Sequence, residues 1–90
     1  MNKLFLILLP AHLDRDKVIT HLASSGAINF WFYNLPYSFF VRSHLNAPQL
    51  QNEILKGFKT ELILIVNIKT GMDFSGIVPD NQAQYFSNIF

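Results

Sequence analysis

Residues 28–42 read INFWFYNLPYSFFVR, and this stretch decides how the chain folds. Its two halves, Ile28–Tyr33 and Tyr37–Arg42, are rich in the aromatic and β-branched residues that favour strands. The residues between them, Asn34-Leu35-Pro36, are a turn signal. Two strand-like runs joined by so short a turn predict a β-hairpin.

A strand and a helix are predicted before this hairpin. Leu4–Leu9 is a continuous apolar run, which is typical of a strand buried on both faces, and Pro10 ends it. The run is shorter than the apolar core of a signal peptide, about 7–15 residues, so we interpret it as a strand and not as a leader. Asp14 is a suitable N-cap for a helix that ends near Gly26.

A second helix and a further strand are predicted after the hairpin. Asn46 can cap a helix that ends at Gly57. Glu53 and Lys56 lie three residues apart on its polar side, which predicts an ion pair worth a few tenths of a kcal/mol. The apolar residues Leu62–Ile68 then predict another strand.

The predicted order of elements is β-α-β-β-α-β, followed by a short edge strand and a helix within residues 70–90. This order is that of the ferredoxin-like α+β sandwich, in which two helices cover one face of a four-stranded antiparallel sheet. The first and third strands are expected in the middle of the sheet and the other two at its edges. We therefore predict a single domain over residues 1–90.

Both faces of the predicted sheet are apolar, although only the helix-covered face has to be. Successive side chains of a strand point to opposite faces, and in the last main strand both sets are apolar. We predict a homodimer in which a second copy packs on the face carrying Trp31, Tyr33, Phe40, Ile63 and Ile65. The alternative is that the C-terminal residues cover this face within one chain, through Phe74, Tyr85, Phe86 and Phe90.

The composition limits the classes of partner. Charged residues are 14% of the chain, hydrophobic residues are 50%, and the net charge is +1. This balance lacks the strongly basic character of a typical nucleic-acid-binding domain. The chain has no Cys, which excludes disulfides and thiolate metal sites and favours a cytoplasmic protein. No apolar segment is long enough to span a bilayer, so we expect no membrane partner.

Several segments resemble the SinR-like family, whose members are related to the smaller CRISPR adaptation endonuclease and to virulence-associated protein D toxins. Tyr37–Ser43 is similar to that family's Ser-Thr-Trp-hydrophobic-Val-Lys/Arg-Ser/Thr segment. The segments that carry the rest of the resemblance are Ser25-Gly26-Ala27, Ala47–Leu50, Glu61–Ile68 and Phe74–Pro79. The resemblance implies a ferredoxin-like fold, a homodimer through the sheets, and kinship to proteins that act on nucleic acid.

The sequence departs from the nuclease relatives at their metal site. Those relatives carry a metal-binding aspartate near the end of the first strand, where this chain has Leu8, Leu9 and Pro10. The nearest carboxylates, those of Asp14 and Asp16, are expected in a helix cap and a first helical turn. We therefore predict no metal site and no cofactor.

The remaining candidates for chemistry are few. His44, His12 and Asp14 are the candidate catalytic residues, and they would act together only if both histidines met Arg42 at one end of the sheet. The candidate nucleic-acid contacts are Arg42, Lys56 and Lys59. The aromatic residues Trp31, Tyr33 and Phe40 would form a base-stacking platform in that case, and a dimer core otherwise.

Three functions follow from these observations. The first is a small non-catalytic homodimer of ferredoxin-like fold. The second is an endoribonuclease or DNase of the CRISPR-associated or toxin type, either metal-dependent or metal-independent. The third is a module that binds nucleic acid weakly. The missing strand-end aspartate favours the first.

Overall fold

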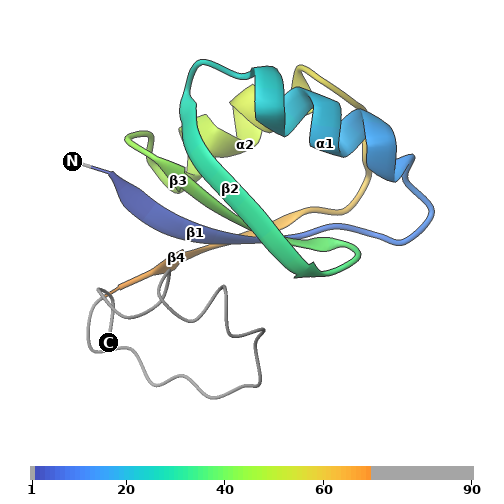
Figure 1. The fold of residues 1–90 in the computed structure, drawn as a ribbon, viewed down its shortest axis with the longest axis horizontal. Helices are drawn as coiled ribbons and strands as arrows, with labels where there is room; N and C mark the ends of the chain where they lie inside the picture. Colours follow the sequence, from blue (N-terminus) through green and yellow to red (C-terminus); the bar gives the residue numbers. More distant parts are fainter. Residues whose placement is uncertain (1, 70–90) are drawn as a thin grey trace.

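The computed structural model describes residues 2–69 of the chain. Within this part the elements follow one another as β-α-β-β-α-β, as predicted (Figure 1). Their bounds are β1 Lys3–Leu8, α1 Arg15–Ser24, β2 Ile28–Leu35, β3 Ser38–Ser43, α2 Ala47–Leu55 and β4 Leu64–Ile68. The predicted C-terminal edge strand and helix lie outside the described residues.

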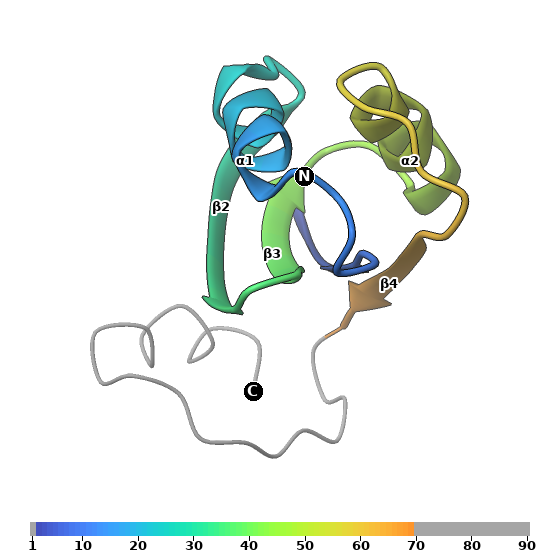
Figure 2. The same cartoon turned by 90° about the vertical axis from the view of Figure 1, so that its right-hand side faces the viewer.

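The four strands form one antiparallel sheet in the order β2-β3-β1-β4. The first and third strands are central and the other two are at the edges, which confirms the predicted topology. Figure 2 shows α1 and α2 next to each other over one face of this sheet. The arrangement is the α+β sandwich of the ferredoxin-like plan.

Both helices begin at the residues that the sequence marks as caps. The Asp14 carboxylate accepts a hydrogen bond from the backbone N–H of Asp16 at 3.0 Å. The Asn46 side chain accepts one from the N–H of Gln49 at 2.9 Å, and the Gln49 side chain accepts one from the N–H of Asn46 at 3.0 Å. This reciprocal capping box satisfies two backbone donors that a helix end leaves free.

The core between the helices and the sheet is apolar and closely packed. Its buried members are Phe5, Ile7, Val18, Leu22, Ile28, Phe39, Val41, Leu50 and Ile54. One polar side chain, Ser43, is fully buried beside them. Its hydroxyl donates to the Ala27 carbonyl at 2.7 Å and accepts from the Leu45 N–H at 3.2 Å, so it is satisfied on both sides.

β2 contains two extra residues relative to its partner β3. Ile28 lies opposite Ser43 while Phe30 lies opposite Arg42, so Asn29 has no counterpart on β3. A second register shift, between Tyr33 and Leu35, leaves Asn34 without one as well. Each shift moves the side chains that follow it to the other face of the sheet.

The predicted dimer face is corrected, because its residues do not lie together. The shift at Asn29 accounts for Trp31 and Tyr33, whereas Ile65 faces the helices because it lies opposite the core residue Ile7. Trp31 packs on the helix-side core, and so do Ile63 and Ile65. Tyr33 lies on the same side, with its ring stacked on Trp31 at 6.4 Å. Phe40 alone lies on the opposite side of the sheet. The five predicted interface residues therefore lie on two different faces of the sheet. The same holds for the predicted base-stacking platform, because Phe40 lies on the face opposite to Trp31 and Tyr33.

The face of the sheet turned away from α1 and α2 is called here the second face. Three rows of side chains cross it from β2 to β4. The first row is Phe30, Arg42, Leu4 and Ile68. The second row is Phe32, Phe40, Leu6 and Val66. The third row is Leu35, Ser38, Leu8 and Leu64. All positions except Arg42 and Ser38 are apolar, so the expectation of two apolar faces is confirmed.

The second face carries a buried cluster of its own. Leu4, Phe32, Phe40 and Ile68 are each 5–7% exposed, and Leu6 packs against them. The rings of Phe32 and Phe40 are stacked, with their centroids 4.9 Å apart. These residues therefore contribute to the stability of the fold as a second core.

Exposed leucines gather where the third row ends the sheet. Leu35, Leu62 and Leu64 are 61%, 68% and 56% exposed, and Leu8 is 37% exposed. These four residues are called the leucine end. β4 begins only at Leu64, later than predicted. Just before it, the Thr60 hydroxyl donates to the Leu62 carbonyl at 2.9 Å and accepts from the Leu62 N–H at 3.3 Å.

Candidate functional site

The structure separates the two histidines that would have to meet at one end of the sheet to act together. His12 follows the end of β1 that pairs with Leu64, whereas His44 follows the end of β3 that pairs with Lys3. Because β1 and β3 are antiparallel, these are opposite ends of the sheet. Arg42 lies on the second face, between Leu4 and Phe30. The condition under which His12, His44 and Arg42 would act together is therefore not met.

The predicted nucleic-acid contacts also divide. Arg42 is on the second face, whereas Lys56 and Lys59 follow α2 on the helix side of the sheet. The Lys56 amine lies 3.1 Å from the Glu53 carboxylate, which confirms the predicted pair. The other oxygen of that carboxylate accepts from the Ser25 hydroxyl at 3.0 Å. The hydrogen bonds from Lys56 and Ser25 hold the pKa of Glu53 below its ordinary value of 4.5.

A groove brings three of the predicted residues together: His12, Asp14 and Lys59. They line a hollow of about 370 Å³ between the start of α1 and the chain that follows α2. The remaining lining residues are Leu13, Lys17, Val18, Gly57 and Phe58. A second hollow, of about 490 Å³, continues along α1 and is lined by Asp16, Lys17, Thr20, His21, Ser24 and Gly57. Because both hollows share Lys17 and Gly57, we treat them as one site, the helix-side groove.

His21 fixes the wall of this groove. Its Nε2 donates to the Glu53 carbonyl, at 2.7 Å, near the end of α2. Its ring also meets the edge of the Phe58 ring, with centroids 6.3 Å apart. A Cβ atom at position 57 would collide with the His21 ring, so only glycine lets the chain pass this close to α1. The residues after α2 are held along α1 by these contacts.

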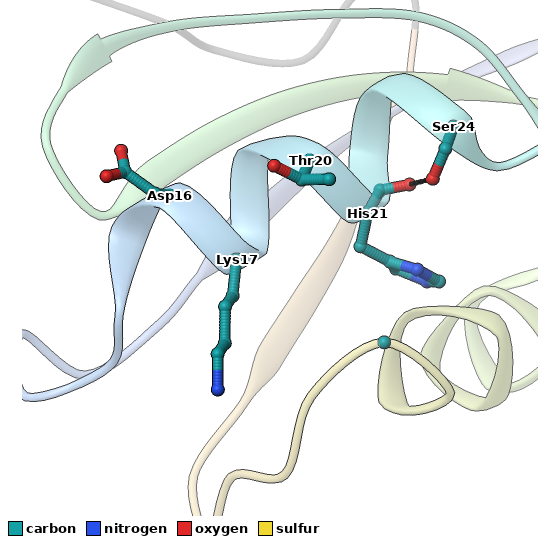
Figure 3. Close-up of a pocket in the computed structure, with 6 residues that line it drawn as sticks. Asp16, Lys17, Thr20, His21 and Ser24 are labelled. Atoms are coloured by element: carbon teal, nitrogen blue, oxygen red, sulfur yellow. Dashed lines mark hydrogen bonds between the residues drawn. The ribbon is translucent and has the colours of Figure 1, made fainter.

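Some side chains of α1 point toward the groove and others point away from it. In Figure 3, Lys17 and His21 extend from one side of α1, toward the chain that follows α2, whereas Asp16 extends away from Lys17. The Asp14 carboxylate is engaged in capping α1, where the helix dipole favours its negative charge. Within residues 2–69, the single ion pair joins Lys56 to Glu53, so Lys17 and Lys59 face the groove without an acidic partner.

The hydroxyl groups of the groove have no hydrogen bond to a base among residues 2–69. Its hydroxyl groups are those of Thr20 and Ser24, and the Ser24 hydroxyl donates to the His21 carbonyl at 3.2 Å, as the dashed line in Figure 3 marks. A nucleophile would need a base within hydrogen-bond reach, and the His21 Nε2 is engaged with Glu53. Among the described residues, His, Asp and Glu side chains do not gather into a group that could hold a metal ion.

A third hollow lies at the leucine end. It measures about 300 Å³ and is lined only by apolar residues, Leu8, Leu9, Pro10, Leu62, Ile63 and Leu64. It lies where β4 pairs with β1, at the end of the third row. Its chemistry suits an apolar side chain of a partner.

Sequence reasoning missed three residues of the helix-side groove: Lys17, His21 and Gly57. The sequence places Gly57 directly after a predicted helix, which indicates a helix stop and does not indicate a close approach to α1. Lys17 and His21 are four residues apart, a spacing that places both on one side of a helix. Lys17 and His21 form the groove together with the segment that follows α2. The apolar patterns of the two helices do not show where that segment runs.

Within residues 2–69, no helix is both long and apolar enough to cross a membrane.

Comparison with known proteins supports the fold. No family model and no curated protein matches the chain. The chain is similar to the crystal structure of PH0061, with a TM-score of 0.55 and 22% sequence identity. The match covers 84% of this chain and 57% of that one, so this chain spans little more than half of that protein's length. At this level of identity the similarity concerns the fold alone.

Proposed function

We propose that this protein acts by association: it is a non-catalytic homodimer whose two copies pack through the second faces of their sheets, at the leucine end. The observation that carries the proposal is the third row of the second face. Its leucines are exposed at the end of a face that is otherwise apolar and, in its first two rows, largely buried. A cluster of exposed apolar side chains beside an apolar hollow marks a protein contact surface.

The free energy of burying the leucine end is of the same size as the cost of dimerisation. In a two-fold dimer the same patch is used by both copies, so four leucines on each copy become eight. At roughly 1–2 kcal/mol for each partly exposed leucine, their burial contributes on the order of 10 kcal/mol. Association costs about 4–15 kcal/mol in lost freedom of motion, so the two terms are comparable. We therefore expect a dimer whose population rises with protein concentration.

The resemblance to the SinR-like family supports the same proposal, because that family is expected to pair through its sheets. The absence of Cys supports a cytoplasmic location. The departure at Leu8, Leu9 and Pro10 supports a role without metal-dependent cleavage.

The test is the molar mass in solution, measured by light scattering on a sizing column. We expect the chain to have a mass near twice 10.4 kDa. The variant Leu62→Glu/Leu64→Glu places two carboxylates in the leucine end and should return the mass to that of one chain. The control Thr20→Glu/Gln51→Glu adds the same charge at exposed helix positions and should remain dimeric. A folded wild-type monomer would contradict the proposal.

The non-catalytic part has a separate test. Purified protein at micromolar concentration is incubated with RNA and with duplex DNA, in Mg²⁺, in Mn²⁺ and in EDTA. We expect no cleavage in any of these conditions. Cleavage that His12→Ala or His44→Ala abolished would instead support the nuclease alternative.

A further inference from the structure

We propose that the helix-side groove binds a phosphate group attached to a flat ring, as in a nucleoside monophosphate or the phosphorylated end of a nucleic acid strand. The proposal is independent of the dimer, because the groove lies on the helix side of the sheet and the leucine end lies on the second face.

Cations outnumber anions in the 370 Å³ hollow, because two lysines and one carboxylate line it. Lys17 and Lys59 extend from two separate elements, α1 and the chain after α2, and both line the 370 Å³ hollow. The Asp14 carboxylate in the same hollow is already bound to the backbone of α1. Two ammonium groups that line one hollow suit a phosphate monoester, to which each can donate a charge-assisted hydrogen bond.

The apolar floor favours a ring next to the phosphate. Leu13, Val18 and Phe58 line the same hollow, and the partly buried Phe58 ring is held in place by the His21 ring. Aromatic side chains bind nucleic acid bases by stacking, which requires no particular base. His12, on the exposed rim, provides a further hydrogen-bond donor or acceptor.

The dimensions agree with this class of ligand. Small-molecule sites have volumes of about 300–1,000 Å³, with an apolar lining and a few polar groups that orient the ligand. The hollow at Lys59 measures about 370 Å³ and continues into the neighbouring hollow along α1. Gly57 lies at the junction, where the chain after α2 approaches α1 most closely.

The experiment is a titration of the isotope-labelled full chain with adenosine 5′-monophosphate at low salt, followed by NMR. We expect the backbone signals of residues 57–59 and of Lys17 to shift, with saturation in the micromolar to millimolar range. Inorganic phosphate tests the charge alone, and adenosine tests the ring alone. Each should bind more weakly than the nucleotide.

Two pairs of variants test the assignment. Lys17→Gln/Lys59→Gln removes both ammonium groups and should weaken nucleotide binding by roughly tenfold or more. The control Lys3→Gln/Lys69→Gln removes the same charge away from the groove and should leave the affinity within about twofold. Phe58→Leu should reduce the affinity for the nucleotide to that for phosphate, while phosphate binding is retained.

A 5′-phosphorylated oligonucleotide distinguishes the two sources of the ligand. Tighter binding than the mononucleotide assigns the site to a strand end, and equal binding assigns it to a free nucleotide. The proposal is overturned if millimolar nucleotide causes no shifts at the groove. Equal weakening by both lysine pairs, or a nucleotide affinity no higher than that of phosphate, would also overturn it.

Discussion

The ring of His21 occupies the space into which any side chain at position 57 would extend. The nearest ring atoms belong to the part of His21 closest to its backbone, so the ring cannot turn aside without losing its bond to Glu53. Gly57→Ala should therefore destabilise the fold by about 1–3 kcal/mol, the usual range for overpacking. Urea denaturation measures this loss.

A matched control exists for this variant. A Cβ atom at Gly26 would meet nothing within 4 Å, so Gly26→Ala should leave the stability unchanged or raise it slightly. The double variant His21→Ala/Gly57→Ala should be less destabilised than the sum of its parts, because the collision is gone. Equal effects of Gly57→Ala and Gly26→Ala would contradict the collision.

The lowered pKa of Glu53 predicts that the free energy of unfolding falls at acidic pH. Hydrogen bonds from Lys56 and Ser25 lower its pKa in the folded protein below the ordinary 4.5. A lowered folded pKa adds stability that is fully present above 4.5 and is lost as the pH falls through the folded value. The urea midpoint is measured for both proteins between about pH 6 and pH 3, and it should fall less for Glu53→Gln than for the wild type. The change is expected to be small, because Lys56 is an exposed partner. Parallel pH profiles for the two proteins would count against the argument.

Phe40 tests whether the second face is a core. Its ring stacks on Phe32 and is 6% exposed, so Phe40→Ala should lower the free energy of unfolding by about 3–5 kcal/mol. Leu64→Ala, in the exposed third row, should lower it by less than about 1 kcal/mol. Chemical denaturation of both variants at one protein concentration measures the difference. Similar small losses would mean that the second face is only a surface.

Variants of Ser43 test what its hydrogen bonds contribute, since Ser43 is the one fully buried polar side chain within residues 2–69. Ser43→Val removes a group that bonds the Ala27 carbonyl and the Leu45 N–H, and leaves both without their partner. The expected loss of stability is about 2–6 kcal/mol, because each of the two unpaired groups costs about 1–3 kcal/mol. Ser43→Thr keeps the hydroxyl and should lose less. A valine variant as stable as the threonine variant would show that these bonds add nothing.

Much of the fold could be predicted from the sequence because its signals are local. Asp14 and Asn46 mark the helix starts, and the alternation of apolar residues marks the strands. The antiparallel order follows from the short hairpin and the two crossover helices. The edge strand and the helix predicted within residues 70–90 lie outside the described residues and stay a prediction.

The faces of β2 could not be assigned by alternation alone. A regular strand would place Ile28 with Phe30 and Phe32, but the extra residue Asn29 places it with Trp31. The only signal is that Asn is uncommon in strands and frequent at irregular backbone, and that one Asn stands on each side of the aromatic run. That signal indicates an irregularity without giving its register.

The helix-side groove could be predicted only in its parts. His12, Asp14 and Lys59 were each visible as candidates, but their meeting depends on the course of the chain after α2. That course is fixed by His21, through the contacts with Glu53, Gly57 and Phe58. None of these contacts joins residues near in sequence to His21, so no local pattern reveals them.

The two extra residues of β2 also affect how this chain meets its neighbours in a concentrated solution. Among residues 2–69, β2 is an edge strand of the sheet. A long aromatic edge is a template on which another chain can add its own strand and begin a fibril. The interruptions at Asn29 and Asn34 break the regular spacing of N–H and carbonyl groups on both sides of residues 30–33. A neighbouring strand therefore finds only a short regular stretch to bond, and the most aromatic segment of the chain is protected against edge-to-edge polymerisation.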